Sequence, residues 1–113
     1  MEEHESAAAR IQMTRSQQGT VVRVVGEMDM DRARQFRTAL DEALADHPAT
    51  IVVDLTALTF CDSSGLNVLL GARQAAVDLG CQLRLAGPNP QVVRLLEMTG
   101  ADQLFPVSPP AAA

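Results

Sequence analysis

The stretch TIVVDLTALTFCDSSGL, residues 50–66, decides how the rest of the chain can fold. Its first six residues, TIVVDL, are too continuously apolar for a strand with one face in water. Such a run is typical of the central strand of a parallel sheet that is covered on both faces. The segment TALTFCD then leads into Ser63, Ser64 and Gly65, which precede a helical pattern. We therefore predict a buried strand, a loop and a helix in succession.

Strand and helix patterns alternate on both sides of this stretch. The predicted strands lie at residues 11–14, 20–25, 50–55 and 82–86, and 105–107 could add a short edge strand. The predicted helices lie near residues 31–45, 64–79 and 90–99. The first two strands form a hairpin that Gly26 is expected to end. This order predicts an α/β fold, with a mixed, mostly parallel sheet of four to five strands and helices packed on it.

The 113 residues allow one domain, which we assign to residues 11–107. Residues 1–10 are expected to form a flexible N-terminal arm, and residues 108–113, SPPAAA, a disordered C-terminal tail.

Composition argues against several classes of partner. The net charge of −5 and the absence of Trp and Tyr disfavour a nucleic-acid partner, which needs basic charge and stacking platforms. No run approaches the ~20 apolar residues of a membrane helix, so we expect no direct membrane insertion. The N-terminus, MEEHE, is acidic, unlike a secretory signal. These features predict a cytoplasmic protein.

The residues that could carry catalysis or bind a metal are sparse. Cys61 and Cys81 fit neither a redox pair nor a metal site, so no metal and no cofactor is expected. His47 stands beside the proline that ends a predicted helix. Asp54 is expected at the end of its strand, accepting backbone or hydroxyl hydrogen bonds. The sequence contains no visible acid–base pair or nucleophile with a base, and we predict that the protein is not an enzyme.

The loop Asp62–Gly65 has three interpretations. Asp and Ser side chains cap helix N-termini, so the loop could serve only to start a helix. The helix N-terminus could instead bind an anion, although the Gly-rich segment and the Lys of a nucleotide-binding loop are missing. Third, a serine here could itself receive a phosphoryl group. Because either hydroxyl could be exposed, the choice between Ser63 and Ser64 as the phosphoacceptor is nearly even on physical grounds alone. Ser64 lies nearer the first turn, where we expect its hydroxyl to bond backbone amides, and this leaves Ser63 freer.

At these residues the sequence resembles the STAS domain family and, within it, the small stand-alone anti-sigma factor antagonists of bacteria. The resemblance covers residues 11–107 and rests on four stretches in the family's order. These are GEMD at 26–29, IVVDLTALTFCDSSGL at 51–66, LRLAGPNPQVVRLLEMTG at 83–100 and DQLFPV at 102–107.

The resemblance implies a partner-switching protein. In the family, the unphosphorylated antagonist binds an anti-sigma factor and so releases the sigma factor. That anti-sigma factor is also a serine kinase, which uses ATP to phosphorylate the first serine after the aspartate, Ser63 in this chain, and thereby switches the antagonist off. A PP2C-type phosphatase reverses the reaction. Asp62, Ser64 and Gly65 match the flanking partner-binding positions, and Asp29 matches an aspartate near the serine in the fold.

The chain departs from the family at Asn67, where Gly is usual, and we expect this change to alter how closely a partner approaches the first helical turn. An alternative function within the family is a STAS subunit of a membrane transport complex. Such subunits commonly lack a good phosphoacceptor, and the intact DSSG sequence argues against that function.

Overall fold

The computed structural model describes residues 10–108. The strands in this range are β1 (Arg10–Ser16), β2 (Gly19–Met28), β3 (Thr50–Asp54), β4 (Leu58–Cys61), β5 (Gln82–Ala86) and β6 (Val107–Ser108). The α-helices are α1 (Met30–Ala45), α2 (Ser63–Leu79) and α3 (Pro90–Thr99), and a short 3-10 helix spans Ala101–Gln103. The three predicted helices are confirmed, and each end lies within about one residue of the expected position.

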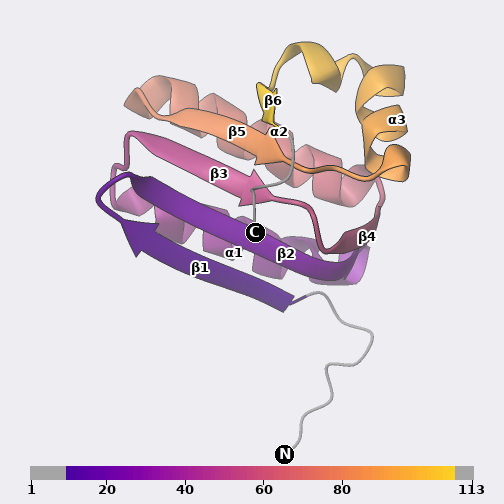
Figure 1. Cartoon of the computed structure of the whole chain (residues 1–113), viewed down its shortest axis with the longest axis horizontal. Coiled ribbons are helices and arrows are strands. Elements are labelled where there is room, and N and C mark those ends of the chain that lie inside the picture. The colour runs from indigo at the N-terminus through magenta and orange to yellow at the C-terminus, as the bar shows by residue number, and fades with distance from the viewer. Residues whose placement is uncertain (1–9, 109–113) are drawn as a thin grey trace, which may run out of the picture.

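Five strands follow the order β1-β2-β3-β5-β6, and β4 pairs with β2 off this path. The β1–β2 pair is antiparallel and the other described pairs are parallel. Figure 1 shows α1 and α2 behind the sheet and α3 beside β4. The predicted fold class is confirmed, but the sheet has six strands instead of four to five. The additional strand is β4, which lies in a segment that the sequence pattern predicted to be a connection.

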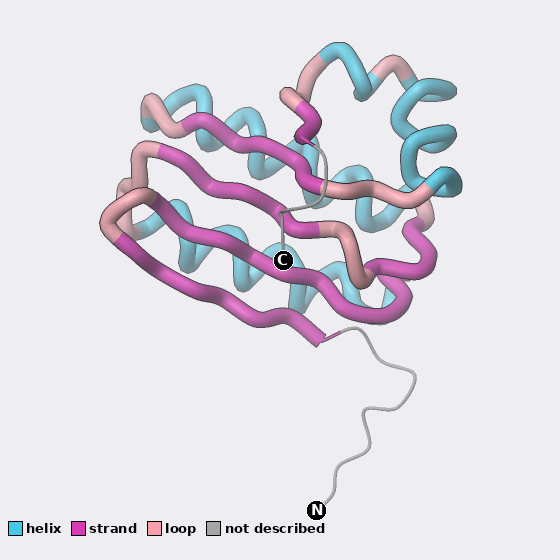
Figure 2. Tube along the Cα trace, viewed as in Figure 1, coloured by secondary structure: helices cyan, strands magenta, loops and turns pink. Residues whose placement is uncertain are grey.

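Strand β3 lies at the centre of the sheet, between β2 and β5. Ile51 and Val53 are buried, whereas Val52 and Asp54, on the opposite face, are only half-buried. In the described part of the chain the long helices cover one face only, so the expectation that this strand is covered on both faces is wrong (Figure 2). Asp54 accepts hydrogen bonds from the N–H of Thr56 at 3.0 Å and from its hydroxyl at 2.7 Å, which confirms the predicted role.

The hydrophobic core fills the space between the sheet and the two long helices. The sheet contributes alternate residues of its inner strands, namely Val22, Val24, Ile51, Val53, Leu83 and Leu85. The helices contribute Phe36 and Leu40 from α1 and Leu66 and Leu69 from α2. Each such side chain stabilises the fold by about 1.5–3 kcal/mol through burial, which fixes α1 and α2 against the sheet.

Strand β2 changes its neighbour at Gly26. Residues Thr20 to Arg23 pair with β3, whereas Gly26 to Met28 pair with β4. Gly26 has a φ of 97°, a conformation that favours glycine, and the β2–β4 register shifts just after it. The prediction that Gly26 ends the strand is therefore wrong, because the glycine bends β2 and the strand continues. This continuation brings the end of β2 beside the loop Asp62–Gly65.

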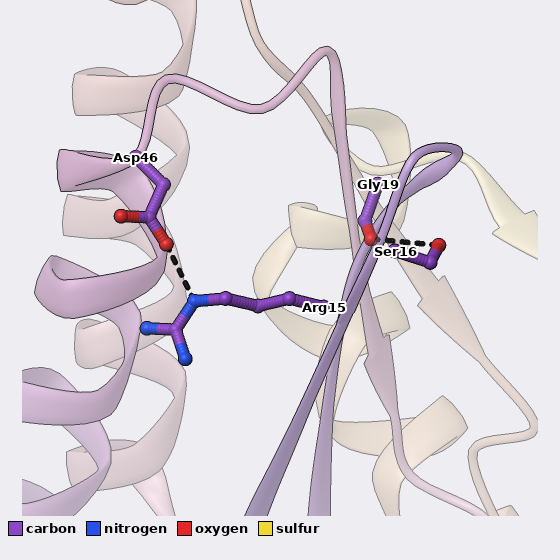
Figure 3. Close-up of polar contacts among 4 residues, drawn as sticks. All are labelled: Arg15, Ser16, Gly19 and Asp46. Carbon is purple, nitrogen blue, oxygen red and sulfur yellow. Dashed lines mark hydrogen bonds and ion pairs between the residues drawn. The ribbon is translucent and has the colours of Figure 1, made fainter.

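The hairpin is tied to the end of α1. Arg15 donates from Nε to the carboxylate of Asp46, and the hydroxyl of Ser16 donates to the carbonyl of Gly19 at 3.2 Å (Figure 3). The ion pair is about half exposed and contributes less than about 1 kcal/mol. Arg10 and Ser108, the inner residues of the predicted arm and tail, belong to β1 and β6. The rest of that arm and tail lies outside the described residues.

Candidate functional site

The candidate site lies where β2 and β4 end side by side (Figure 1). Met28 is opposite Cys61 in the parallel ladder, and the backbone N–H of Asp62 donates to the carbonyl oxygen of Met28 at 3.1 Å. The residue after each strand end, Asp29 or Asp62, is the N-cap of the following helix. Two matching strand–aspartate–helix units therefore stand next to each other, and two of the predicted site residues are brought together.

Asp62 determines how α2 begins. Its Oδ1 accepts hydrogen bonds from the backbone N–H groups of Ser64 at 2.9 Å and Gly65 at 3.4 Å. These bonds satisfy amides that lack partners within the helix, and the carboxylate is favourable at the positive end of the helix dipole. The equivalent residue Asp29 accepts from the backbone N–H of Asp31 at 3.1 Å.

The two serines differ in exposure. Ser63 is the first residue of α2 and is exposed, whereas Ser64 is half-buried. The expectation that the Ser64 hydroxyl caps the helix is wrong, because Asp62 takes that role. Among the described residues, neither serine hydroxyl has a hydrogen-bond partner. Exposure therefore distinguishes Ser63 from Ser64.

Gly65 lies beneath the surface. It is buried, and a Cβ placed on it would lie 2.7 Å from both Sγ of Cys61 and Cγ of Met28. Real Cβ atoms essentially never approach other atoms this closely. Glycine therefore lets the first turn of α2 pack directly on the ends of β2 and β4, which sets the position of Ser63.

Asn67 is exposed one helical turn after Ser63. It borders a hollow of about 190 Å³ between α1 and α2, which is also lined by Arg37, Asp41 and Gly71. Because its side chain is larger, an asparagine at this position leaves a partner less room to enter this hollow, the α1–α2 groove, than a glycine would.

Two residues at the start of α3, for which the sequence predicted no role at the site, hold the free edge of β4. Nδ2 of Asn89 donates to the carbonyl oxygens of Leu58 at 2.9 Å and Thr59 at 3.2 Å. Gln91 accepts from the backbone N–H of Cys61 at 2.9 Å and donates to its carbonyl at 2.8 Å. The only sequence signal for this contact was the pair of amide residues that flank Pro90. Such a pair predicts a contact only if β4 is already known to be a strand with a free edge.

The site contains a buried thiol, that of Cys61, and an exposed hydroxyl, that of Ser63. Burial, with a smaller effect of the Asp62 carboxylate, raises the pKa of Cys61 to about 11, so this cysteine is a neutral thiol at pH 7.

Within residues 10–108 no group of three or more His, Cys, Asp or Glu residues is arranged to hold a metal ion. In the same range no helix is both long and apolar enough to span a membrane.

Comparison with known families assigns the fold. The family model described as "Mlab, STAS domain" matches residues 11–106. Because this match covers most of the chain, the protein belongs to the STAS domain family. An anti-sigma F factor antagonist of Paenibacillus polymyxa is 34% identical over 99 residues, which cover 87% of this chain and 85% of that protein.

Solved structures agree with this assignment. An anti-sigma factor antagonist from Mycobacterium paratuberculosis superposes with a TM-score of 0.82 at 27% identity, covering 90% of this chain and 86% of that one. The Bacillus cell fate determinant SpoIIAA in its phosphorylated form gives a TM-score of 0.68 at 24% identity, covering 88% of this chain and 90% of that one. At this identity the SpoIIAA structure shows a shared fold alone.

Proposed function

We propose that this protein is an anti-sigma factor antagonist that phosphorylation of Ser63 switches off. The observation that carries the proposal is the exposed Ser63 at the first position of a 17-residue helix, beside two capping aspartates. Relatives named anti-sigma factor antagonists, such as the Paenibacillus protein, support the same function. SpoIIAA, which shares the fold, has a structure in a phosphorylated form.

The geometry gives a physical basis for the switch. A phosphoryl group on Ser63 adds about −1.5 to −2 charges at a helix N-terminus, where the helix dipole tolerates it. The same charge is added beside the carboxylates of Asp29 and Asp62, on the face that would meet a partner. Like charges brought together in an interface cost several kcal/mol, enough to release a bound protein without refolding of the domain.

The partner in this proposal is an anti-sigma factor with serine kinase activity, and a PP2C-type phosphatase restores the binding form. Asp29, Asp62, Ser64 and Asn67 lie around Ser63 and would contact the anti-sigma factor, while Gly65 would act by setting the helix position. The protein then works in the cytoplasm as a binding regulator and not as an enzyme.

Phosphorylation by candidate anti-sigma kinases tests the proposal. The purified chain is incubated with each kinase and ATP, and the phosphosite is mapped by mass spectrometry. We expect phosphate on Ser63, loss of phosphorylation in Ser63→Ala, and retention of it in the matched control Ser64→Ala. Ser63→Ala should also bind the kinase constitutively, and Ser63→Asp should bind it weakly.

Three results would contradict the proposal. They are phosphate on Ser64, tight binding of the kinase by Ser63→Asp, and co-purification of the chain with a membrane transport complex instead of an anti-sigma factor. The last result would support the alternative function.

A further inference from the structure

Two large apolar side chains are exposed on the elements next to Ser63, one at the start of α1 and one on β4. The first is Met30, whose side chain is 74% exposed. Met30 is the first residue of α1 after the cap Asp29, as Ser63 is the first residue of α2 after the cap Asp62. Because Met28 and Cys61 are paired in the ladder just before these caps, both helices begin at the same end of the molecule. A protein that contacts Ser63 is therefore brought against Met30.

The second apolar side chain is Phe60, which is 42% exposed on β4. The other two phenylalanines, Phe36 and Phe105, are buried in the core. Phe60 alternates with the buried Cys61 and is opposite Glu27 in the ladder, so it points away from the core. The backbone that carries it is held by β2 on one edge and by the α3 amides on the other, so the ring is presented on a rigid support.

We infer that Met30 and Phe60 are the apolar anchors by which the anti-sigma factor kinase recognises this protein, an inference that rests on the proposed function. The partner surface that fits them has an apolar recess and a basic side chain, since the carboxylates of Asp29 and Asp62 cap the two helices that begin with Met30 and Ser63. Binding energy in protein interfaces concentrates in a few large side chains, and methionine adapts its shape to a partner. The anchors supply affinity in both phosphorylation states, and the charge on Ser63 supplies the switch.

Substitutions of the anchors separate these two contributions. The variants are Met30→Gln, which keeps length and helix propensity, and Phe60→Thr, which keeps strand propensity. The matched control is Met98→Gln, because Met98 is 77% exposed and lies near the end of α3. With the kinase that phosphorylates the wild-type chain, we measure KM and kcat for Ser63 phosphorylation and the Kd of the unphosphorylated protein by calorimetry.

Each anchor variant should raise KM and Kd by about tenfold with little change in kcat, and Met98→Gln should match the wild type. Unchanged KM and Kd in a folded Met30→Gln variant, with the wild type still phosphorylated, would overturn the inference and leave the proposed function standing. Absence of phosphorylation in the wild type would instead overturn the proposed function. If Phe60→Thr melts early, Met30→Gln decides alone, since its side chain is mostly exposed.

Discussion

The side-chain amide of Gln91 pairs with the backbone of Cys61 as a neighbouring strand would. Its Oε1 accepts from the Cys61 N–H at 2.9 Å and its Nε2 donates to the Cys61 carbonyl at 2.8 Å. The opposite edge of β4 is paired with β2, so the short strand that leads to Asp62 and Ser63 is held from both sides. A single residue of α3 therefore links the third helix to the candidate site.

Replacing Gln91 with alanine should lower the free energy of unfolding by about 1–3 kcal/mol, because two part-buried backbone groups lose their partners. Urea denaturation measures this loss, and amide hydrogen exchange at Cys61 should become faster. The control is Gln74→Ala, since Gln74 is exposed and, within residues 10–108, its side chain bonds only with Asp78 on its own helix. Equal stability of the two variants would show that Gln91 does not hold β4.

The sequence predicted the parts of the fold that depend on local pattern. The continuous apolar run of residues 50–55 and the helical periodicities correctly placed β3 and all three α-helices. Strand β4 was missed because LTFC has only four residues and its pairing depends on distant partners, β2 and the α3 amides. Gly26 was misjudged for the same reason, since a glycine that bends a strand and one that ends it look alike locally.

The candidate site was likewise predicted in part. The loop Asp62–Gly65 was found, because capping residues before a helical pattern are a local signal. The position of Asp29 near this loop was expected from the family resemblance alone, because it depends on the pairing of Met28 with Cys61, a long-range contact that no local pattern reveals. The burial of Gly65 follows from the same pairing, and so does the exposure of Phe60.

Two glycines of α2 should respond in opposite ways to alanine. Gly65→Ala should cost about 1–3 kcal/mol, because its methyl group would lie 2.7 Å from Cys61 and Met28 atoms. Gly71→Ala should stabilise the protein by about 0.5–1 kcal/mol, since alanine favours the helix and, apart from the chain neighbours and the backbone of its own helix, no atom of the described residues lies within 4 Å of its Cβ position. Thermal and urea unfolding of both variants measure the difference. A Gly65→Ala variant as stable as Gly71→Ala would contradict the close packing.

Stability should fall between about pH 9 and pH 11. Burial raises the pKa of Cys61 from 9.0 to about 11, and burial also raises the pKa of Cys81. Below pH 9 the thiols are protonated in both states and their contribution is complete. As the pH rises through this window the unfolded chain loses thiol protons that the folded protein keeps, so the free energy of unfolding decreases. The loss from Cys61 is about 2–3 kcal/mol.

Few side-chain types other than cysteine can contribute to a change in stability between pH 9 and pH 11 in this protein. The chain has neither Tyr nor Lys, the two other side-chain types whose ordinary pKa values lie near 10. Urea denaturation at a series of pH values measures the slope for the wild type and for Cys61→Ala. The variant should show a shallower decrease, with the remainder due to Cys81. The same slope in both proteins would show that Cys61 does not titrate as its burial requires.

Substitutions of Asp62 and Asn67 should distinguish the contribution of helix capping to stability from the contribution of partner contact to affinity. Asp62→Ala removes the acceptor for two backbone amides at the start of α2 and should cost about 1–2 kcal/mol of stability. Asn67→Ala removes an exposed side chain that makes no hydrogen bond within the described residues, and it should change stability by less than about 0.5 kcal/mol.

Because both residues flank Ser63, both substitutions should change the Kd for the anti-sigma factor, measured by calorimetry below the melting range of each variant. If Asn67→Ala keeps the wild-type Kd, the α1–α2 groove is not part of the contact surface. If Asp62→Ala loses stability but keeps the wild-type Kd, Asp62 only caps the helix.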